Sequence, residues 1–139
     1  MAFQTLRRVE FRDTDAAGIA HFTAFLAYAE EAEHALLRSV GLSVLMHDEQ
    51  GPITWPRVSV RADFQGAVRF EDELRIDVTV ARLGTKSVTY QFQFVHDERL
   101  VAAAETTAVC CRLPAGGPPR SIAIPESIAE RLREYLANE

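Results

Sequence analysis

The sequence predicts an α+β domain in which an antiparallel sheet of five or six strands wraps around one long central helix. One window, residues 22–40, is rich in Ala, Leu and Glu and repeats apolar side chains at helical spacing. Three later windows alternate apolar and polar residues, as half-buried strands do. Short turn sequences link these windows, whereas a doubly wound parallel sheet requires helical crossovers.

The first forty residues supply a strand, a turn and the helix. We expect a first strand near residues 3–12, where apolar and polar side chains alternate, and then a polar turn at Asp13–Gly18. The helix is predicted from Phe22 to about Val40, and Gly41 is suited to end it. Its apolar face consists of Phe22, Phe25, Leu26, Ala29, Ala32, Leu36, Leu37 and Val40.

The remaining chain supplies the strands and a closing helix. A short second helix is predicted at Ser43–Glu49, before the breaker Gln50-Gly51-Pro52. The strands are predicted at residues 58–64, 74–80, 88–94 and 100–113, with hairpin turns at 83–86 and 96–99. Pro125 precedes a terminal helix, Glu126–Leu136, because proline is tolerated at a helix start.

Composition indicates one globular domain, residues 1–139. Hydrophobic residues make up 47% and charged residues 25%, and the formal net charge is −5. The scattered basic residues exclude the basic stripe that duplex nucleic acids require. No apolar run approaches the ~18 residues of a membrane span, and the N-terminus lacks the features of a signal peptide. We therefore expect a cytoplasmic protein that binds neither nucleic acid nor membrane.

The sequence predicts no metal site. Cys110 and Cys111 are adjacent and lack the C-x-x-C spacing of zinc ligands, so we interpret them as reduced packing residues. The acidic turn has the opening of a calcium loop, but the closing bidentate acid would fall on Ala24. Glu31 and His34 have the spacing of a di-iron ligand pair, whose necessary second copy is missing from the sequence.

The turn before the long helix carries the candidate chemistry. Two acids, Asp13 and Asp15, stand in a short segment closed by Gly18, directly before a helix start. A carboxylate can attack a carbonyl or activate water, and the unpaired N–H groups of a helix start can hold the developing oxyanion. We expect Asp13 to be structural and to bond N–H groups of the turn.

The segment Asp13-Thr14-Asp15-Ala16-Ala17-Gly18-Ile19, followed by an aromatic-rich helix, resembles the signature of hotdog-fold acyl-CoA thioesterases. It most resembles the 4-hydroxybenzoyl-CoA thioesterase type. The resemblance covers nearly the whole chain. It includes Trp55-Pro56, Phe70-Glu71-Asp72, Lys86-Ser87 and Ile122–Pro125.

The resemblance implies roles for particular residues. Asp15 falls on the family's catalytic carboxylate, and the backbone N–H of Phe22 falls on its oxyanion contact. Glu30 falls where aryl-CoA enzymes recognise the ring substituent. Lys86 and Thr85 fall where the nucleotide phosphates of CoA bind.

Further residues around the expected pocket are open to more than one interpretation. His21 either lines the pocket and assists proton transfer or is a helix-entry histidine. Trp55, with Phe22 and Phe25, is expected to line the substrate pocket. Glu33 projects from the apolar helix face, where a carboxylate is costly unless it is paired, so it needs a partner or faces a site.

The resemblance therefore implies a hotdog-fold thioesterase that hydrolyses an aryl- or acyl-CoA thioester to the free acid and CoA. No cofactor is implied beyond the CoA of the substrate. Asp15 would act as nucleophile or as general base, and the sequence leaves both open. The family forms homodimers or homotetramers with active sites between subunits. A non-catalytic acyl-CoA-binding protein and a hotdog dehydratase or hydratase, using His21 or His34, are the alternatives.

Overall fold

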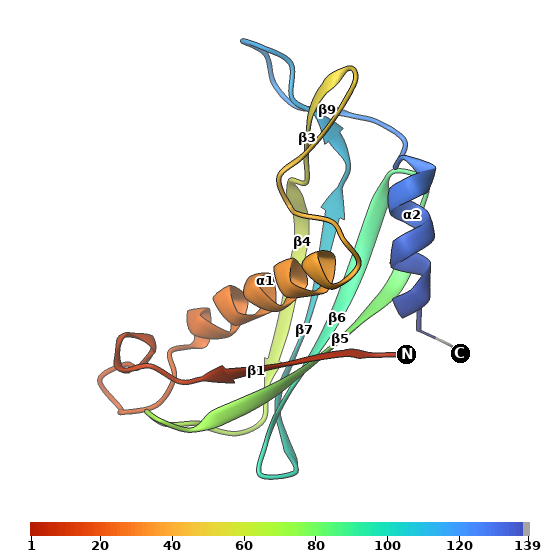
Figure 1. Ribbon diagram of the computed structural model, residues 1–139. Coiled ribbons are helices and arrows are strands. Elements are labelled where there is room, and N and C mark those ends of the chain that lie inside the picture. The colour runs from red at the N-terminus through yellow and green to blue at the C-terminus, as the bar shows by residue number, and fades with distance from the viewer. Residues whose placement is uncertain (138–139) are drawn as a thin grey trace.

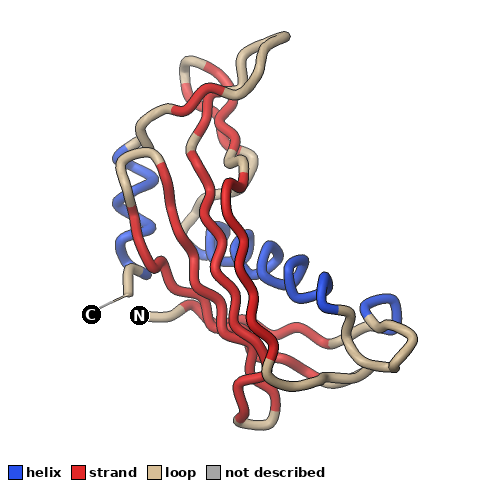
Figure 2. Tube along the Cα trace, turned by 180° about the vertical axis from the view of Figure 1, so that it is seen from behind, coloured by secondary structure: helices blue, strands red, loops and turns tan. Residues whose placement is uncertain are grey.

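The computed structural model describes residues 1–137, in which a five-stranded antiparallel sheet packs against one long helix (Figure 1). The sheet has the order β1-β5-β6-β7-β4. Its elements are β1 (Phe3–Arg8), β4 (Arg57–Phe64), β5 (Glu73–Leu83), β6 (Ser87–His96) and β7 (Arg99–Val109), with α1 (Phe22–Ser39) across one face. The view from behind shows the strands in front of the helix (Figure 2). The predicted α+β class, antiparallel sheet and long helix are confirmed.

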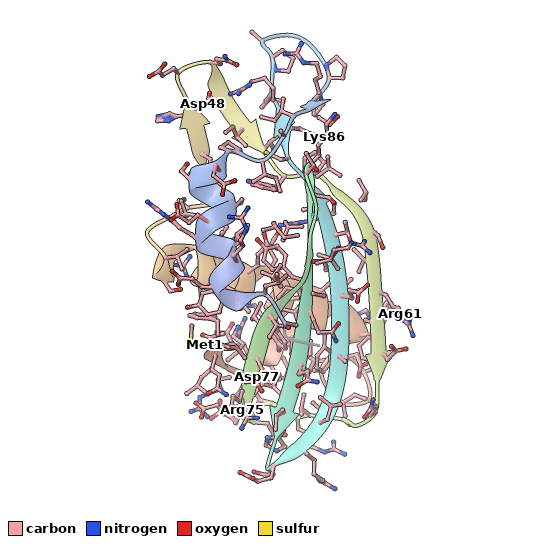
Figure 3. All side chains as sticks on the ribbon, turned by 90° about the vertical axis from the view of Figure 1, so that its right-hand side faces the viewer. Met1, Asp48, Arg61, Arg75, Asp77 and Lys86 are labelled. Atoms are coloured by element: carbon pink, nitrogen blue, oxygen red, sulfur yellow. The ribbon has the colours of Figure 1, made fainter. Side chains whose placement is uncertain are left out.

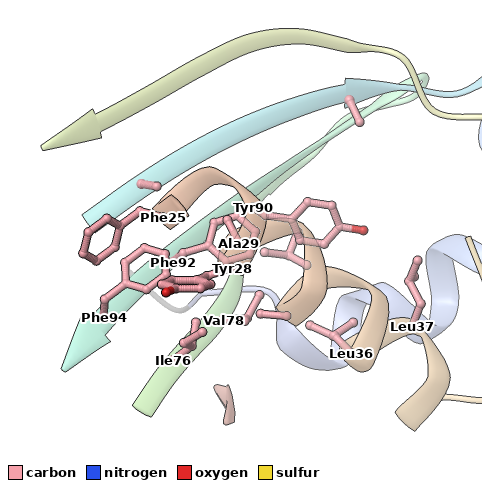
Figure 4. Packing of buried hydrophobic residues seen from close by; sticks show 14 of the residues in the cluster. Phe25, Tyr28, Ala29, Leu36, Leu37, Ile76, Val78, Tyr90, Phe92 and Phe94 are labelled. Carbon is pink, nitrogen blue, oxygen red and sulfur yellow. The ribbon is translucent and has the colours of Figure 1, made fainter. Parts of the chain in front are cut away.

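Helix α1 supplies one side of the hydrophobic core. Tyr28 and Leu36 are fully buried, and Ala29 is small enough to let the sheet approach closely. The facing layer comes from β5 and β6 and includes Ile76, Val78, Phe92 and Phe94 (Figure 4). The helix ends as predicted, since Gly41 adopts a φ of +81° that other residues rarely reach. No helix within residues 1–137 is both long and apolar enough to cross a membrane.

The predicted short helix at Ser43–Glu49 is wrong, because this segment opens a β-hairpin. A second sheet has the order β2-β3-β8-β9 and consists of β2 (Met46–Asp48), β3 (Gly51–Thr54), β8 (Cys111–Arg112) and β9 (Arg120–Ser121). Asp48 accepts a hydrogen bond from the Gln50 N–H (2.9 Å), which favours a turn. Arg112 donates to both Asp48 and the Gly51 carbonyl. These contacts outweigh the weak helical tendency of so short a segment.

Three predicted boundaries also shift. The first strand ends at Arg8, and a 3₁₀ turn, η1 (Phe11–Asp13), follows it. The predicted last strand is divided at Cys110, whose N–H donates to the Lys86 carbonyl and whose carbonyl accepts from Ile122. The terminal helix consists of α2 (Glu126–Leu132) and a 3₁₀ turn, η2 (Arg133–Tyr135). Both cysteines are buried and free, in agreement with a packing role.

Strand β4 forms an edge of the main sheet. Its neighbour on one side is β7, and its other side is unpaired within residues 1–137. Val58, Val60 and Phe64 of this strand are 62%, 52% and 46% exposed. The register with β7 shifts between Arg57 and Ser59, which marks a β-bulge.

Candidate functional site

Main-chain hydrogen bonds fix the acidic turn that precedes α1. The Asp15 N–H donates to the Ile19 carbonyl, and the Gly18 N–H donates to the Asp15 carbonyl, each at 2.9 Å. Gly18 has a φ of +80°, which explains why the turn needs glycine there. The His21 N–H donates to the Asp13 carbonyl (2.7 Å). These bonds fold the turn back on the start of the helix.

Asp15 is a half-buried residue in this turn. Its Oδ1 accepts a hydrogen bond from the Ala17 N–H at 2.8 Å. An ionised carboxylate has about four acceptor positions, so most of its accepting capacity remains for water or a ligand. The turn thus orients the Asp15 carboxylate and leaves most of its acceptor positions available.

His21 and Phe22 form the start of α1. His21 is the N-cap residue, and its Nδ1 accepts from the Thr23 N–H at 3.2 Å. The structure therefore gives His21 a helix-entry role, and its predicted role in a pocket stays a prediction. Phe22 is the first helical residue, so its N–H is one of those that a helix leaves without an internal partner. The Phe22 side chain is 60% exposed and stacks near the His21 ring, with 4.6 Å between centroids.

Asp13 has the structural role that the sequence predicted. Its Oδ2 accepts from the Glu10 N–H (2.9 Å) and from the Tyr28 hydroxyl (2.8 Å). Arg7 lies 3.5 Å from the same oxygen. Burial, followed by the hydrogen bond to Asp13, raises the pKa of Tyr28 above its usual value, so the hydroxyl stays a neutral donor.

Glu33 has the partner that its place on the apolar helix face requires. The residue is 3% exposed, and its Oε2 lies 2.9 Å from Nη2 of Arg57. Burial raises the pKa of Glu33, and the neighbouring guanidinium opposes that shift. Nη2 of Arg57 also lies 3.9 Å from Glu30. Sequence reasoning missed Arg57, because an arginine at a strand start carries no distinctive signal.

Two adjoining hollows meet at Glu30 and Arg57. One, of about 280 Å³, lies between α1 and the β4 edge and is also lined by Leu26, Ala27, Glu33, Val60, Phe92 and Thr106. The other, of about 770 Å³, lies under the β2–β3 hairpin and includes Trp55 and His34 in its lining. Trp55 and Glu30 thus share a cavity wall, whereas Phe25, expected in the same pocket, is buried in the core.

Thr85 and Lys86 occupy the predicted turn between β5 and β6. Their carbonyls accept from the N–H groups of Ile124 (2.8 Å) and Cys110 (2.7 Å), which fixes the hairpin. The Lys86 side chain is exposed near the hairpin tip (Figure 3). Within one chain this hairpin and the acidic turn lie at opposite ends of the molecule (Figure 1).

The structure thus divides the predicted site residues into groups. His21 and the N–H of Phe22 lie at the start of α1, Asp15 stands in the turn before it, and Glu30 lies eight residues after Phe22 on the same helix. The hairpin residues lie apart from both. In the described part of the chain, no cluster of three or more His, Cys, Asp or Glu side chains is placed to hold a metal ion.

Known proteins of similar sequence are named as CoA thioester hydrolases. A family model described as the thioesterase-like superfamily matches residues 9–132. A 1,4-dihydroxy-2-naphthoyl-CoA hydrolase of Synechococcus elongatus is 28% identical over 135 residues, which cover 96% of this chain and 94% of the relative. A protein of the same name from Synechococcus sp. strain WH7803 is 35% identical over 103 residues, covering 69% and 67% of the two chains.

Solved structures share the fold. A 1,4-dihydroxy-2-naphthoyl-CoA thioesterase from Synechocystis superposes with a TM-score of 0.84 at 26% identity, covering 96% of this chain and 97% of the other. A gentisyl-coenzyme A thioesterase has a TM-score of 0.80 at 24% identity, with 94% and 99% covered. The latter likeness bears on the fold alone.

Proposed function

The chain belongs to the thioesterase-like superfamily, and from that premise we propose that it hydrolyses an aryl- or acyl-CoA thioester to the free acid and CoA. The names of its relatives, which act on 1,4-dihydroxy-2-naphthoyl-CoA, support a CoA thioester as substrate. The observation that carries the proposal is the acidic turn. It holds Asp15, a half-buried residue, in a turn that is joined to the start of α1 by the hydrogen bond from the His21 N–H to the Asp13 carbonyl.

In the proposed reaction the thioester carbonyl oxygen accepts a hydrogen bond from the Phe22 N–H. That donor stabilises the oxyanion, an effect of about 3 kcal/mol per donor in enzymes. The Asp15 carboxylate attacks the carbonyl carbon and CoA leaves as a thiolate, after which water cleaves the resulting anhydride. Alternatively, Asp15 takes a proton from water as the water oxygen attacks the carbonyl carbon; the C–S bond then breaks, and the proton passes from Asp15 to the leaving CoA thiolate. Both routes consume one water and restore the carboxylate.

Replacing Asp15 with Asn tests the chemistry. We expect Asp15→Asn to lower kcat by roughly 10²–10⁴-fold, because the amide neither attacks nor accepts a proton. The affinity for a CoA thioester and the circular dichroism spectrum should stay the same. Thiol release from a panel of acyl-CoA esters measures turnover, and Asp97→Asn, in an exposed hairpin, is the matched control. Wild-type turnover in Asp15→Asn contradicts the mechanism. No thiol release from any ester would favour the non-catalytic binding protein.

The proposed site is completed by a second copy of the chain. Phe25, near the start of α1, contacts Phe64 at the end of β4, whereas Glu33 pairs with Arg57 at the beginning of β4. Helix and edge strand therefore run in opposite directions. A two-fold axis through the exposed β4 edge would bring the acidic turn of one protomer toward the opposite end of its partner. Thr85 and Lys86, at that end, would then contact the CoA phosphates.

Mixing two inactive variants tests this shared site. In a mixed dimer of Asp15→Asn and Lys86→Glu, one site would combine an intact Asp15 from one chain with an intact Lys86 from the other. Co-refolded or co-expressed chains should recover roughly a quarter of wild-type activity at low substrate concentration, because half of randomly formed dimers carry one such site. Each variant alone should stay nearly inactive. The absence of recovery in verified mixed dimers would place both residues in the same chain's site.

A further inference from the structure

Arg57 faces the helix because of the β-bulge in β4. Arg57 pairs in register with Ala108 of β7, and Ser59 pairs with Thr107, so Val58 is an extra residue. Without the bulge, alternation would place Arg57 on the same face as Arg61. Arg61 is 78% exposed and points away from α1 (Figure 3). Arg57 instead reaches the buried Glu33 of α1.

Glu33 fixes the guanidinium of Arg57 but occupies only part of its hydrogen-bonding capacity. Nη2 is bound to Glu33, whose side chain is 4% exposed. Nη1 is buried and has no hydrogen-bond partner within residues 1–137, as is also true of the Thr106 hydroxyl. Buried donors without partners are rare and costly in folded proteins, so these groups fit a ligand that would satisfy them.

Both groups belong to residues that line the smaller hollow, together with Glu30 and Glu33, and apolar side chains form the rest of its wall. Leu26, Ala27, Val60 and Phe92 supply the apolar wall, and Leu26 follows Phe22 by one helical turn. From Phe22 to Glu30 the helix rises about 12 Å, and the Glu30 side chain leans back toward the helix start. The hollow therefore runs along α1 from Leu26, one turn after the proposed oxyanion donor, to Glu30 and Glu33.

We propose that Arg57 is a specificity-determining residue, which donates a hydrogen bond to an oxygen on the far end of the acyl group, and that Glu33 positions it. This inference rests on the proposed function, because it assigns the acyl pocket of that same site. The acyl group would have an apolar, ring-sized body with a hydroxyl group distal to the thioester.

The charges around Arg57 favour a hydroxyl over a carboxylate. Glu30 and Glu33 are both within 4 Å of the guanidinium, so two acids face one base. A further negative charge would be repelled. A hydroxyl could accept from Nη1 of Arg57 and donate to Glu30, whose side chain is 60% exposed and available.

The test compares CoA thioesters that differ in one substituent. The substrates are benzoyl-CoA, its three monohydroxy isomers and a carboxybenzoyl-CoA. Arg57→Lys is the main variant, because lysine retains the positive charge beside Glu33 but lacks the second amino group. Arg99→Lys, in the exposed β6–β7 hairpin, is the matched control. Thermal melts verify that each variant is folded.

We expect wild type to prefer at least one hydroxylated ester to benzoyl-CoA and to reject the carboxylated ester. Arg57→Lys should reduce the preference for the hydroxyl about 10- to 100-fold, the range of a hydrogen bond to a charged group. The loss should lie in KM, with kcat unchanged, because the contact is remote from the reacting carbon. Glu33→Gln should lower the same preference, because Arg57 then loses the carboxylate that fixes it. Arg99→Lys should match wild type.

Binding separates failure of this inference from failure of the proposed function. The Kd of each thioester is measured with the Asp15→Asn protein, with and without Arg57→Lys. A preference for the hydroxyl that depends on Arg57 supports the inference even if no thioester is cleaved. Thioester hydrolysis with the same hydroxyl preference in Arg57→Lys as in wild type overturns it, as does a wild-type preference for the carboxylated ester.

Discussion

Removing the positive charge from the buried ion pair should destabilise the fold strongly. Arg57→Met leaves Glu33, which is 3% exposed, without the guanidinium at 2.9 Å. Breaking a buried pair from one side costs about 3–5 kcal/mol. The Arg57 side chain is 26% exposed, so water can partly replace it, and we expect the lower end, about 3 kcal/mol. For a chain of 139 residues this corresponds to a fall in Tm of roughly 10 °C.

The loss of stability in Arg57→Met should depend on pH, because Glu33 is an acid whose pKa is raised in the folded state. Removing Arg57 raises that pKa further. Between the unfolded pKa, about 4.3 for Glu, and the higher folded pKa, the native state binds more protons, so stability falls as pH rises. The deficit of Arg57→Met should therefore be small near pH 4 and largest at neutral pH.

Urea unfolding at pH 4.5 and pH 7.5 measures this effect, at a fixed protein concentration because the stability of the proposed dimer would depend on concentration. The control is the double variant Glu33→Leu with Arg57→Met. This double variant leaves no unpaired charge in the pair. Its free energy of unfolding should lie within about 1 kcal/mol of the wild-type value or above it. A loss below about 1 kcal/mol for Arg57→Met at pH 7.5 would refute the reasoning, because it would mean that Glu33 is hydrated.

Two further substitutions test the turn and its support. Tyr28→Phe removes the hydroxyl that donates to Asp13 at 2.8 Å and should lower the free energy of unfolding in urea by about 1–3 kcal/mol. An unchanged urea midpoint would mean that water replaces the hydroxyl. Gly18→Ala should cost about 1–2 kcal/mol, because φ is +80° there. It should also lower thioester hydrolysis, whereas Gly116→Ala, at a φ of +72°, should show a similar strain without loss of activity.

The features that the sequence predicted correctly are those set by local signals. Most of the predicted apolar face of α1 is buried, although Phe22 and Leu26 are exposed. This face, the stop at Gly41 and the hairpin turns at 83–86 and 96–99 all depend on neighbouring residues. Strand alternation likewise reports burial on one face. The acidic turn was recognisable for the same reason, because Asp15 and Gly18 stand three residues apart and the helix follows directly.

The features that it missed depend on contacts between distant residues. The β2–β3 hairpin is stabilised by Arg112, which lies 64 residues from Asp48 in the sequence. Glu33 could be recognised as needing a partner, but the bulge that brings in Arg57 has no sequence signal. The placement of Lys86 far from the acidic turn follows from the sheet order, which alternation alone does not determine.

The proposed catalysis and the proposed acyl selection depend on different kinds of contact in this fold. Main-chain hydrogen bonds, from the N–H groups of Asp15 and His21, hold the acidic turn in place and tolerate changes of neighbouring side chains. The hollow is shaped by side chains of α1 and β4. Substitutions there can therefore change which acyl group fits without moving the Asp15 carboxylate. Val60 belongs both to that hollow and to the exposed strand edge. In the proposed dimer, acyl selection and assembly are therefore coupled through β4, while the proposed chemistry stays with the turn.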